Sequence, residues 1–231
     1  MGTVCHVFEF LRRLRRTGPA TVPASAPAPG SATEPRREAD WLVVGLGNPG
    51  PEYAATRHNA GYLVLDAVLD EANLELQPLP GVPARVAVAD GVAYARSATY
   101  MNTSGEAVGP LAERLGVPPE RVLVIHDELD LPPGKVRVKL GGNENGHNGL
   151  KSITAALGTR DYARVRVGIG RPPRGTAVPD WVLAPFDSAV HPAKAADQAG
   201  VGAAIGLAAE AVRLATGEGL AKAQNLIHPR S

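Results

Sequence analysis

The chain has 231 residues, with 24 Lys and Arg against 23 Asp and Glu, so its formal net charge is only +1. Six of the basic and three of the acidic residues lie within residues 1–39, which leaves 18 basic and 20 acidic residues for the remainder. Net charge therefore cannot drive nucleic-acid binding by residues 40–231, and any contact with a polyanion requires a local basic patch.

Residues 1–39 differ in composition from the rest of the chain. Between 17 and 35 they are mainly Ala, Pro, Ser, Thr and Gly, which cannot bury enough apolar surface to offset the entropy of ordering. We therefore predict a disordered extension over 1–39 and one folded domain over 40–231. The only cysteine, Cys5, excludes an internal disulfide framework, and no apolar run is long enough to span a membrane. A cytoplasmic protein without a membrane partner is expected.

The domain begins with an apolar run over residues 41–46, WLVVGL, which is typical of a buried strand. Loop composition follows from Gly47, and His58 lies on this loop directly before a helical pattern that ends near Leu76. Loops at the carboxyl ends of strands in open α/β sheets are where ligands and catalytic groups gather. We therefore expect the His58 imidazole at a functional edge of a sheet.

The same stretch, GLGNPG, formally matches a dinucleotide-binding fingerprint. That fingerprint needs a helix that begins within the glycines, so that its N-terminus faces the pyrophosphate. Pro49 and Pro51 delay the helix, and Asp66 lies inside the helical pattern instead of at the end of a second strand. These features argue against a dinucleotide-binding site.

A hairpin is predicted next, because two alternating runs over residues 85–90 and 92–97 flank Asp90-Gly91. Its second strand leads into TYMNTSGEAV, where Thr103 and Glu106 predict a capping box at the start of a helix that Gly116 ends. Asn102 thus lies at a strand-to-helix junction, as Asn48 does.

The next strand, residues 121–125, runs into HDELD, which concentrates His126, Asp127 and further acids at a strand end. Two later strands each alternate basic with apolar residues, one over 135–140 and one over 164–169. Between Lys135 and Arg174 the sequence holds nine basic and two acidic residues, so the local basic patch is expected here. The glycine-rich loop over 141–149 follows the first of these strands and ends near Asn148.

These residues predict a hydrolase. His58 is the natural general base near neutral pH, and Asp127 is the best group to orient it. Asn48, Asn102 and Asn148 can hold carbonyls and stabilise negative charge on oxygen. No serine or cysteine stands in a nucleophile motif, so water is the expected nucleophile. With the basic patch, this points to ester or amide hydrolysis on a phosphate-bearing substrate.

The motifs GLGNPGPEYAATRHNAGY, TYMNTSGEAV, HDELDLPPGKVRVKLGG and GHNGLKSI closely resemble, in order and spacing, the bacterial peptidyl-tRNA hydrolase family. The resemblance implies a monomeric α/β protein with a single-domain mixed, twisted β-sheet surrounded by α-helices, phosphorylase/hydrolase-like, which needs no metal or cofactor. It implies cleavage of the ester between a peptide and the 3′-terminal ribose of tRNA, its partner. The implied site residues, grouped by role, are the catalytic pair His58 and Asp127, the substrate-binding Asn48, Tyr53, Met101, Asn102 and Asn148, and the tRNA phosphate contacts Arg137 or Lys139 with Arg166.

Two departures from the family pattern keep an alternative open. Ser97 stands where the family usually has Pro, and Asn145 replaces a Gly of the glycine-rich loop beside the acidic Glu144. A tRNA-binding protein of the same fold that does not turn over would fit these departures. The other alternative is a metal-dependent hydrolase with an ion among His58, His126, His147 and Asp127, although no metal-ligand repeat is present.

Overall fold

The computed structural model describes residues 38–186 and 195–231. The predicted extension over 1–39 therefore lies outside the described residues except for its last two. In the described part, a seven-stranded sheet has the order β2-β3-β4-β1-β5-β7-β6. Its strands are β1 (Trp41–Gly45), β2 (Gln77–Pro78), β3 (Ala84–Ala89), β4 (Val92–Ser97), β5 (Val122–Glu128), β6 (Val136–Leu140) and β7 (Ala163–Gly168).

The sheet is mixed, as predicted. Strands β4, β1, β5 and β7 run parallel to their neighbours, whereas β3 pairs antiparallel with β4, β2 with β3, and β6 with β7. The predicted hairpin is confirmed, and its turn residues Asp90 and Gly91 both have positive φ, at 50° and 76°. That backbone matches the twist of the flanking strands, which is why this dipeptide was a strong local signal.

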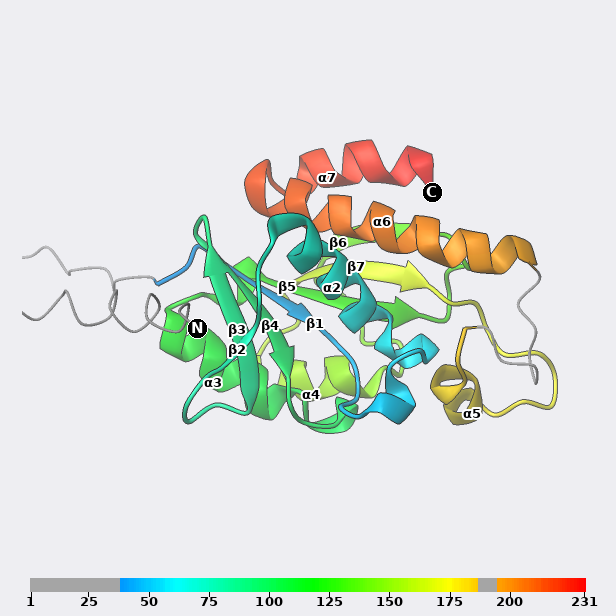
Figure 1. Ribbon diagram of the computed structural model, residues 1–231, viewed down its shortest axis with the longest axis horizontal. Helices are drawn as coiled ribbons and strands as arrows, with labels where there is room; N and C mark the ends of the chain where they lie inside the picture. Colours follow the sequence, from blue (N-terminus) through cyan, green and yellow to red (C-terminus); the bar gives the residue numbers. More distant parts are fainter. Residues whose placement is uncertain (1–37, 187–194) are drawn as a thin grey trace, which may run out of the picture. The chain divides into compact units, whose positions relative to one another are not determined.

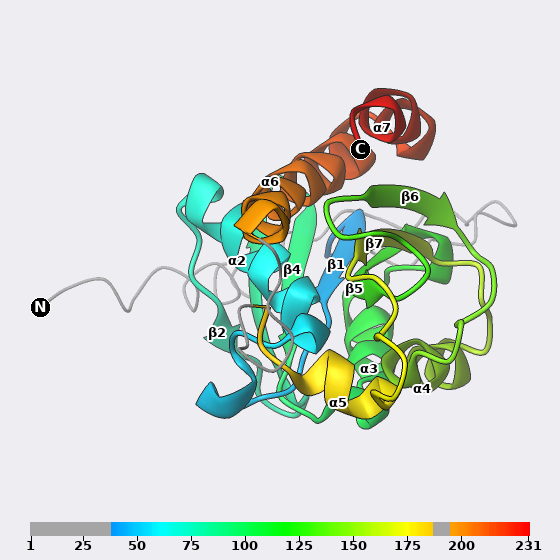
Figure 2. The ribbon, with the colours of Figure 1, turned by 90° about the vertical axis from the view of Figure 1, so that its right-hand side faces the viewer.

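Helices cover both faces of the sheet (Figures 1 and 2). One apolar cluster joins the sheet to α2 (Ala60–Ala72), α6 (Ala195–Gly217) and α7 (Leu220–Ile227). The other joins the opposite face to α3 (Gly105–Leu115) and α4 (Asn148–Leu157). The short α5 (Val178–Leu183) lies beside the turn that precedes α2. No helix of the described part is long and apolar enough to cross a bilayer.

Helix α2 approaches the sheet unusually closely, and this approach positions the site. An added Cβ on Gly61 would lie 2.3 Å from the carbonyl oxygen of Ile125 on β5 and 2.5 Å from the backbone nitrogen of Leu46. Only glycine permits such contact between backbones. The turn before α2, which carries His58, is thereby held over the end of β5, which carries Asp127.

The open edge of the sheet at β6 is covered by the end of the chain. Ser231 Oγ donates to the Val136 carbonyl at 2.8 Å, and Gln224 Nε2 donates to that of Val138 at 3.2 Å. His228 Nε2 accepts from the Val138 nitrogen at 3.1 Å. An uncovered edge strand presents unpaired backbone groups to other chains, and these side chains remove that exposure.

Three local predictions are corrected by the structure. Thr103 does not cap α3, because the chain enters the helix through a 3₁₀ turn, Met101–Thr103, and the Thr103 hydroxyl donates back to the Tyr100 carbonyl at 3.2 Å. The first amide of α3, on Gly105, is instead bound by Ser152 Oγ of α4 at 2.9 Å. Helix α2 ends at Ala72, before left-handed Asn73, and β5 continues to Glu128, so HDE belongs to the strand.

Candidate active site

His58 and Asp127 meet at the carboxyl end of the sheet. His58 lies in the 3₁₀ turn Arg57–Asn59, and its Nδ1 is 2.9 Å from Asp127 Oδ1. The Asp127 side chain is 3% exposed, and that of His58 is 13% exposed. The two residues predicted to act as a pair therefore lie within hydrogen-bond distance, and both side chains are largely buried.

The electrostatics of the pair favour a charged imidazole over a neutral carboxyl. Burial alone would lower the pKa of His58, but the charge of Asp127 and its hydrogen bond raise that pKa above its ordinary value. Burial alone would raise the pKa of Asp127, yet the two neighbouring imidazoles, His58 and His147, hold it well below the usual range. Asp127 therefore remains a carboxylate that can stabilise an imidazolium.

The second imidazole belongs to His147, which was predicted only as a possible metal ligand. Its Nε2 is 3.0 Å from the same oxygen, Asp127 Oδ1. Its Nδ1 accepts a hydrogen bond from the Leu150 amide at 3.3 Å, so His147 caps α4. Because Nδ1 is an acceptor, Nε2 carries the proton and donates to Asp127. The sequence feature that could have predicted this role is the position of His147 directly before Asn148, where a helix begins.

His126 does not contact the Asp127 carboxylate that binds His58 and His147. It is 1% exposed, its Nδ1 lies 2.6 Å from the Asp127 carbonyl oxygen, and its Nε2 has no hydrogen-bond partner among the described residues. Burial, followed by the neighbouring His147, holds the pKa of His126 well below the ordinary value, so the ring is neutral. The structure places ligand atoms of His58, Asp127 and His147 within 4.8 Å of one another, without His126.

Asn48 connects its own loop, after β1, to the turn before α3. The side chain of Asn59 grips the Asn48 backbone, accepting from its nitrogen at 2.9 Å and donating to its oxygen at 3.0 Å. Asn48 Oδ1 in turn accepts from the Met101 amide at 2.8 Å. Its Nδ2 makes no hydrogen bond within the described chain. The support that Asn59 gives to Asn48 could not be predicted from the sequence, because the two residues lie 11 positions apart.

The other predicted substrate residues surround this connection. Asn102 and Asn148 are exposed, at the turn before α3 and at the first position of α4. Their two segments touch, since a Cβ on Gly149 would lie 2.6 Å from Met101 Sδ. Met101 itself is buried, and the half-buried Tyr53 packs its ring edge-on against Tyr100 at 6.5 Å between centroids.

The predicted tRNA contacts lie on β6 and β7 but differ in their surroundings. Arg166 forms an ion pair with buried Glu128, with Nη2 2.9 Å from Oε2. Arg137 donates to Ser231 at the C-terminus, at 2.5 Å to its hydroxyl. Lys139 has no ion pair in the described chain, and burial together with nearby Arg166 and Arg164 lowers its pKa. Lys139 is therefore the freest of the three predicted contacts.

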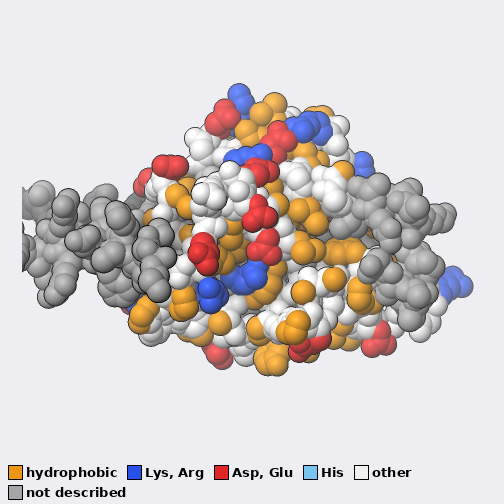
Figure 3. Space-filling view, viewed as in Figure 1, with side chains coloured by type: hydrophobic (Ala, Val, Ile, Leu, Met, Phe, Trp, Pro, Cys, Tyr) orange, Lys and Arg blue, Asp and Glu red, His pale blue; other side chains and the backbone are white. Residues whose placement is uncertain are grey.

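One residue of the predicted basic patch, Arg164, is buried and does not contribute to the protein surface. Arg164 is 1% exposed and donates to the carbonyls of Gly142 and Asn143, both at 2.7 Å. It supports the glycine-rich loop from below instead of facing solvent. On the face viewed in Figure 3, basic side chains stand beside acidic ones and form no continuous patch, in keeping with the nearly balanced composition.

The structure accommodates the two departures from the family pattern. Asn145 has φ of 48°, a left-handed conformation that Asn adopts more readily than other non-glycine residues, and its Nδ2 is 3.4 Å from Glu128 Oε2. Ser97 Oγ accepts from the Thr99 amide at 3.1 Å and so fixes the turn. Glu144 is paired with Arg160 at 2.7 Å, a hydrogen bond that lowers its pKa to about 2.

The His58–Asp127 contact at the carboxyl end of a mixed α/β sheet is typical of a hydrolase, and the relatives of this chain agree with that class. Residues 42–231 match the family described as Peptidyl-tRNA hydrolase. Peptidyl-tRNA hydrolase 2 of Corynebacterium glutamicum is 57% identical over 194 residues, covering 83% of this chain and 89% of the relative. Peptidyl-tRNA hydrolase of Nocardia farcinica is 45% identical over 216 residues, covering 92% of this chain and all of the relative.

Solved structures give the same result. The crystal structure of peptidyl-tRNA hydrolase from Acinetobacter baumannii matches with a TM-score of 0.73 and 35% identity, covering 84% of this chain and 97% of that one. The chain therefore belongs to the peptidyl-tRNA hydrolase family.

Proposed function

We propose that this protein hydrolyses the ester between the carboxyl end of a peptide and the 3′-terminal ribose of tRNA. The observation that carries the proposal is the 2.9 Å contact of His58 Nδ1 with Asp127, because it leaves Nε2 as the nitrogen that can accept a proton from water. Family membership supplies the substrate class, and the basic strands β6 and β7 supply a place for its phosphates.

In this mechanism, His58 Nε2 removes a proton from water as the water oxygen attacks the ester carbonyl carbon. Asp127 stabilises the resulting imidazolium, and His147 keeps Asp127 in place. Negative charge on the former carbonyl oxygen is met by amide donors, with Asn48 Nδ2 the best placed and Asn102 and Asn148 beside it. The ester C–O bond then breaks, and the imidazolium returns its proton to the ribose oxygen.

Binding is divided between two regions in this proposal. Tyr53 and Met101 line the peptide side, and Lys139 with Arg166 contacts tRNA phosphate. Arg137 is a weaker candidate for the phosphate contact because its guanidinium is bound to Ser231. Phosphate contacts position a nucleic acid without reading its sequence, so different tRNAs should bind alike. We further propose that the protein acts as a monomer in the cytoplasm.

The test is to follow the oxygen atom. Purified protein is incubated with N-acetylated aminoacyl-tRNA in water enriched in ¹⁸O, and both products are analysed by mass spectrometry. We expect the label in the carboxylate of the released N-acetyl amino acid and none in the tRNA 3′ hydroxyl. Label in the ribose, or tRNA bound without any cleavage, would contradict the proposal, and the second result would establish the binding-only alternative.

A metal-dependent hydrolase is the second candidate, because three ligand atoms of His58, Asp127 and His147 cluster within 4.8 Å. Two of those atoms, however, are already within 3.0 Å of Asp127 Oδ1, which is hydrogen-bond geometry around one carboxylate oxygen. Cleavage that is lost in EDTA and restored by Zn²⁺ would favour this candidate over the metal-free mechanism.

A further inference from the structure

Arg57, the neighbour of His58, has an unusual environment for an arginine. It is 3% exposed, yet no Asp or Glu of the described residues pairs with it. Its Nη1 donates to the carbonyls of Trp181 and Ala184, both at 3.3 Å. Its guanidinium carbon lies 3.9 Å from the ring centroid of Trp181, a cation–π contact. Among the described residues, this buried guanidinium is therefore contacted by carbonyl oxygens and aromatic rings instead of a carboxylate.

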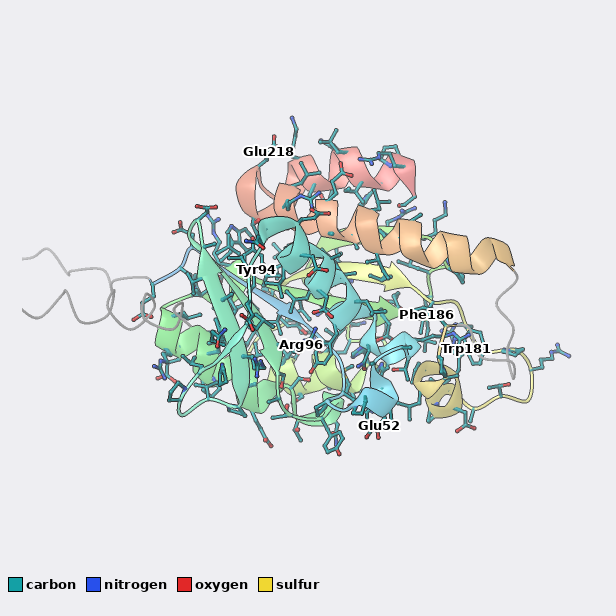
Figure 4. The ribbon with its side chains drawn as sticks, viewed as in Figure 1. Glu52, Tyr94, Arg96, Trp181, Phe186 and Glu218 are labelled. Atoms are coloured by element: carbon teal, nitrogen blue, oxygen red, sulfur yellow. The ribbon has the colours of Figure 1, made fainter. Side chains whose placement is uncertain are left out.

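These contacts attach α5 to the turn that carries His58. The Arg57 amide donates to the Ala184 carbonyl at 3.1 Å, and the Phe186 amide donates to that of Ala55 at 3.2 Å. Trp181 Nε1 donates to the Gly170 carbonyl at 2.9 Å, just beyond β7. Trp181 and Phe186 accordingly lie together beside this turn (Figure 4). The α5 segment is thus fixed both to the end of β7 and to the turn.

The turn depends on such outside support. A 3₁₀ turn of three residues has poor internal hydrogen bonding and little stability of its own. Asn59 ties its far side to the backbone of Asn48, and Arg57 ties its near side to α5. His58 stands between these two attachments, and its 2.9 Å contact with Asp127 depends on the position of the turn.

We propose that Arg57 is a positioning residue for His58: through Trp181 and Ala184 it holds the turn at the distance where His58 Nδ1 meets Asp127. Arg57 does not touch the substrate and takes no part in proton transfer. The inference rests on the proposed role of His58 as general base.

The test compares Arg57→Ala with a matched control, Arg114→Ala. Arg114 is exposed on α3 and also donates to a backbone carbonyl, that of Pro80 at 2.8 Å, away from the site. Because small misplacements of catalytic groups cost roughly a hundredfold in rate, we expect Arg57→Ala to lower kcat by about ten- to a hundredfold while KM stays within about twofold. Arg114→Ala should leave both constants unchanged.

A pH profile separates positioning from general loosening of the fold. Asp127 raises the pKa of His58, so a displaced turn should return that pKa toward its ordinary value. The acid limb of kcat/KM in Arg57→Ala should therefore move to lower pH. Trp181→Leu, which removes the ring but keeps Arg57, should reproduce a smaller loss of kcat, and adding it to Arg57→Ala should cost little more, because both act through one contact.

A kcat for Arg57→Ala within twofold of the unsubstituted protein, or a loss confined to KM, would overturn the inference. If Arg57→Ala fails to fold, Trp181→Leu decides: an unchanged kcat there is equally contrary. The proposed function fails separately. Substantial turnover by His58→Ala would contradict the role of His58 as general base. An inactive His58→Ala together with a fully active Arg57→Ala would refute only the positioning role of Arg57.

Discussion

His58 differs from an ordinary surface histidine because one of its nitrogens is committed to a buried carboxylate. Asp127 Oδ1 is hydrogen-bonded to two imidazoles. His58 Nδ1, in the turn before α2, lies 2.9 Å from it, and His147 Nε2, at the start of α4, lies 3.0 Å from it. Neither contact is visible in the local sequence, since 69 residues separate His58 from Asp127 and 20 separate Asp127 from His147. Residue type predicted the first pair, but nothing predicted that the carboxylate is shared.

This arrangement predicts the pH dependence of activity. A general base must be neutral, and the pKa of His58 is raised above its ordinary value of 6.5, so kcat/KM should rise as pH increases through that higher pKa. Asp127→Asn removes the charge that raises it. The acid limb of this variant should move to lower pH while kcat falls, which a rate profile between pH 5 and 9 measures. An acid limb that stays in place would show that another group titrates.

Among the elements, those with local signals were predicted well. The strand at Trp41–Gly45, the hairpin around Asp90-Gly91 and the end of α3 at Gly116 follow from short-range patterns. The capping box failed because a 3₁₀ turn precedes α3 and another helix supplies the cap. The closure of the β6 edge by Ser231 and His228 was also unpredictable, because it joins residues about 90 positions apart.

The close approach of α2 to the sheet can be tested at this level. Gly61→Ala puts a methyl group 2.3 Å from the Ile125 carbonyl oxygen, so one of the two elements must shift. Overpacking of this kind costs about 1–3 kcal/mol in the free energy of unfolding, and the shift should also lower kcat by moving His58. Urea denaturation and steady-state rates measure both effects.

Gly206→Ala is the matched control, because Gly206 also lies within a helix, α6, but its added Cβ meets no atom within 4 Å. The same substitution there should raise the free energy of unfolding by ~0.4–1 kcal/mol, because alanine lowers the conformational entropy of the unfolded chain. It should leave kcat unchanged. Equal destabilisation of both variants would mean that the approach of α2 is not what makes Gly61 necessary.

For the molecule as a whole, the net charge of +1 does not indicate where a polyanion would bind, whereas the distribution of basic residues along the sequence points to β6 and β7. Four of the nine basic residues between Lys135 and Arg174 lie on β6 and β7, but of these Arg164 is buried under the glycine-rich loop and Arg166 is paired with Glu128. A strand pattern gives the side of the sheet on which a residue lies. It does not give the neighbours that neutralise its charge, which depend on packing between distant segments.

Lys139 offers the cleanest test of the tRNA contact, since replacing Arg166 would leave the buried Glu128 without its partner. Lys139→Ala should raise KM for peptidyl-tRNA with little change in kcat. The slope of log affinity against log salt should fall by about 1, because one phosphate contact is lost. Lys222→Ala, which removes the same charge from the exposed face of α7, should alter neither quantity. A Lys139 variant with the original salt slope would exclude this residue from the contact.

If His58, supported by Asp127, is the base of a metal-free ester hydrolysis, cleavage must depend on its imidazole and not on a bound metal ion. The most direct measurement is single-turnover release of N-acetyl amino acid from tRNA by the unsubstituted protein and by His58→Ala, each with and without EDTA, alongside tRNA binding. We predict cleavage that persists in EDTA, a loss of at least about a hundredfold in His58→Ala, and tRNA binding that is equal in both proteins. Substantial cleavage by His58→Ala would contradict the role of His58 as base, and cleavage that the chelator abolishes would contradict a metal-free mechanism.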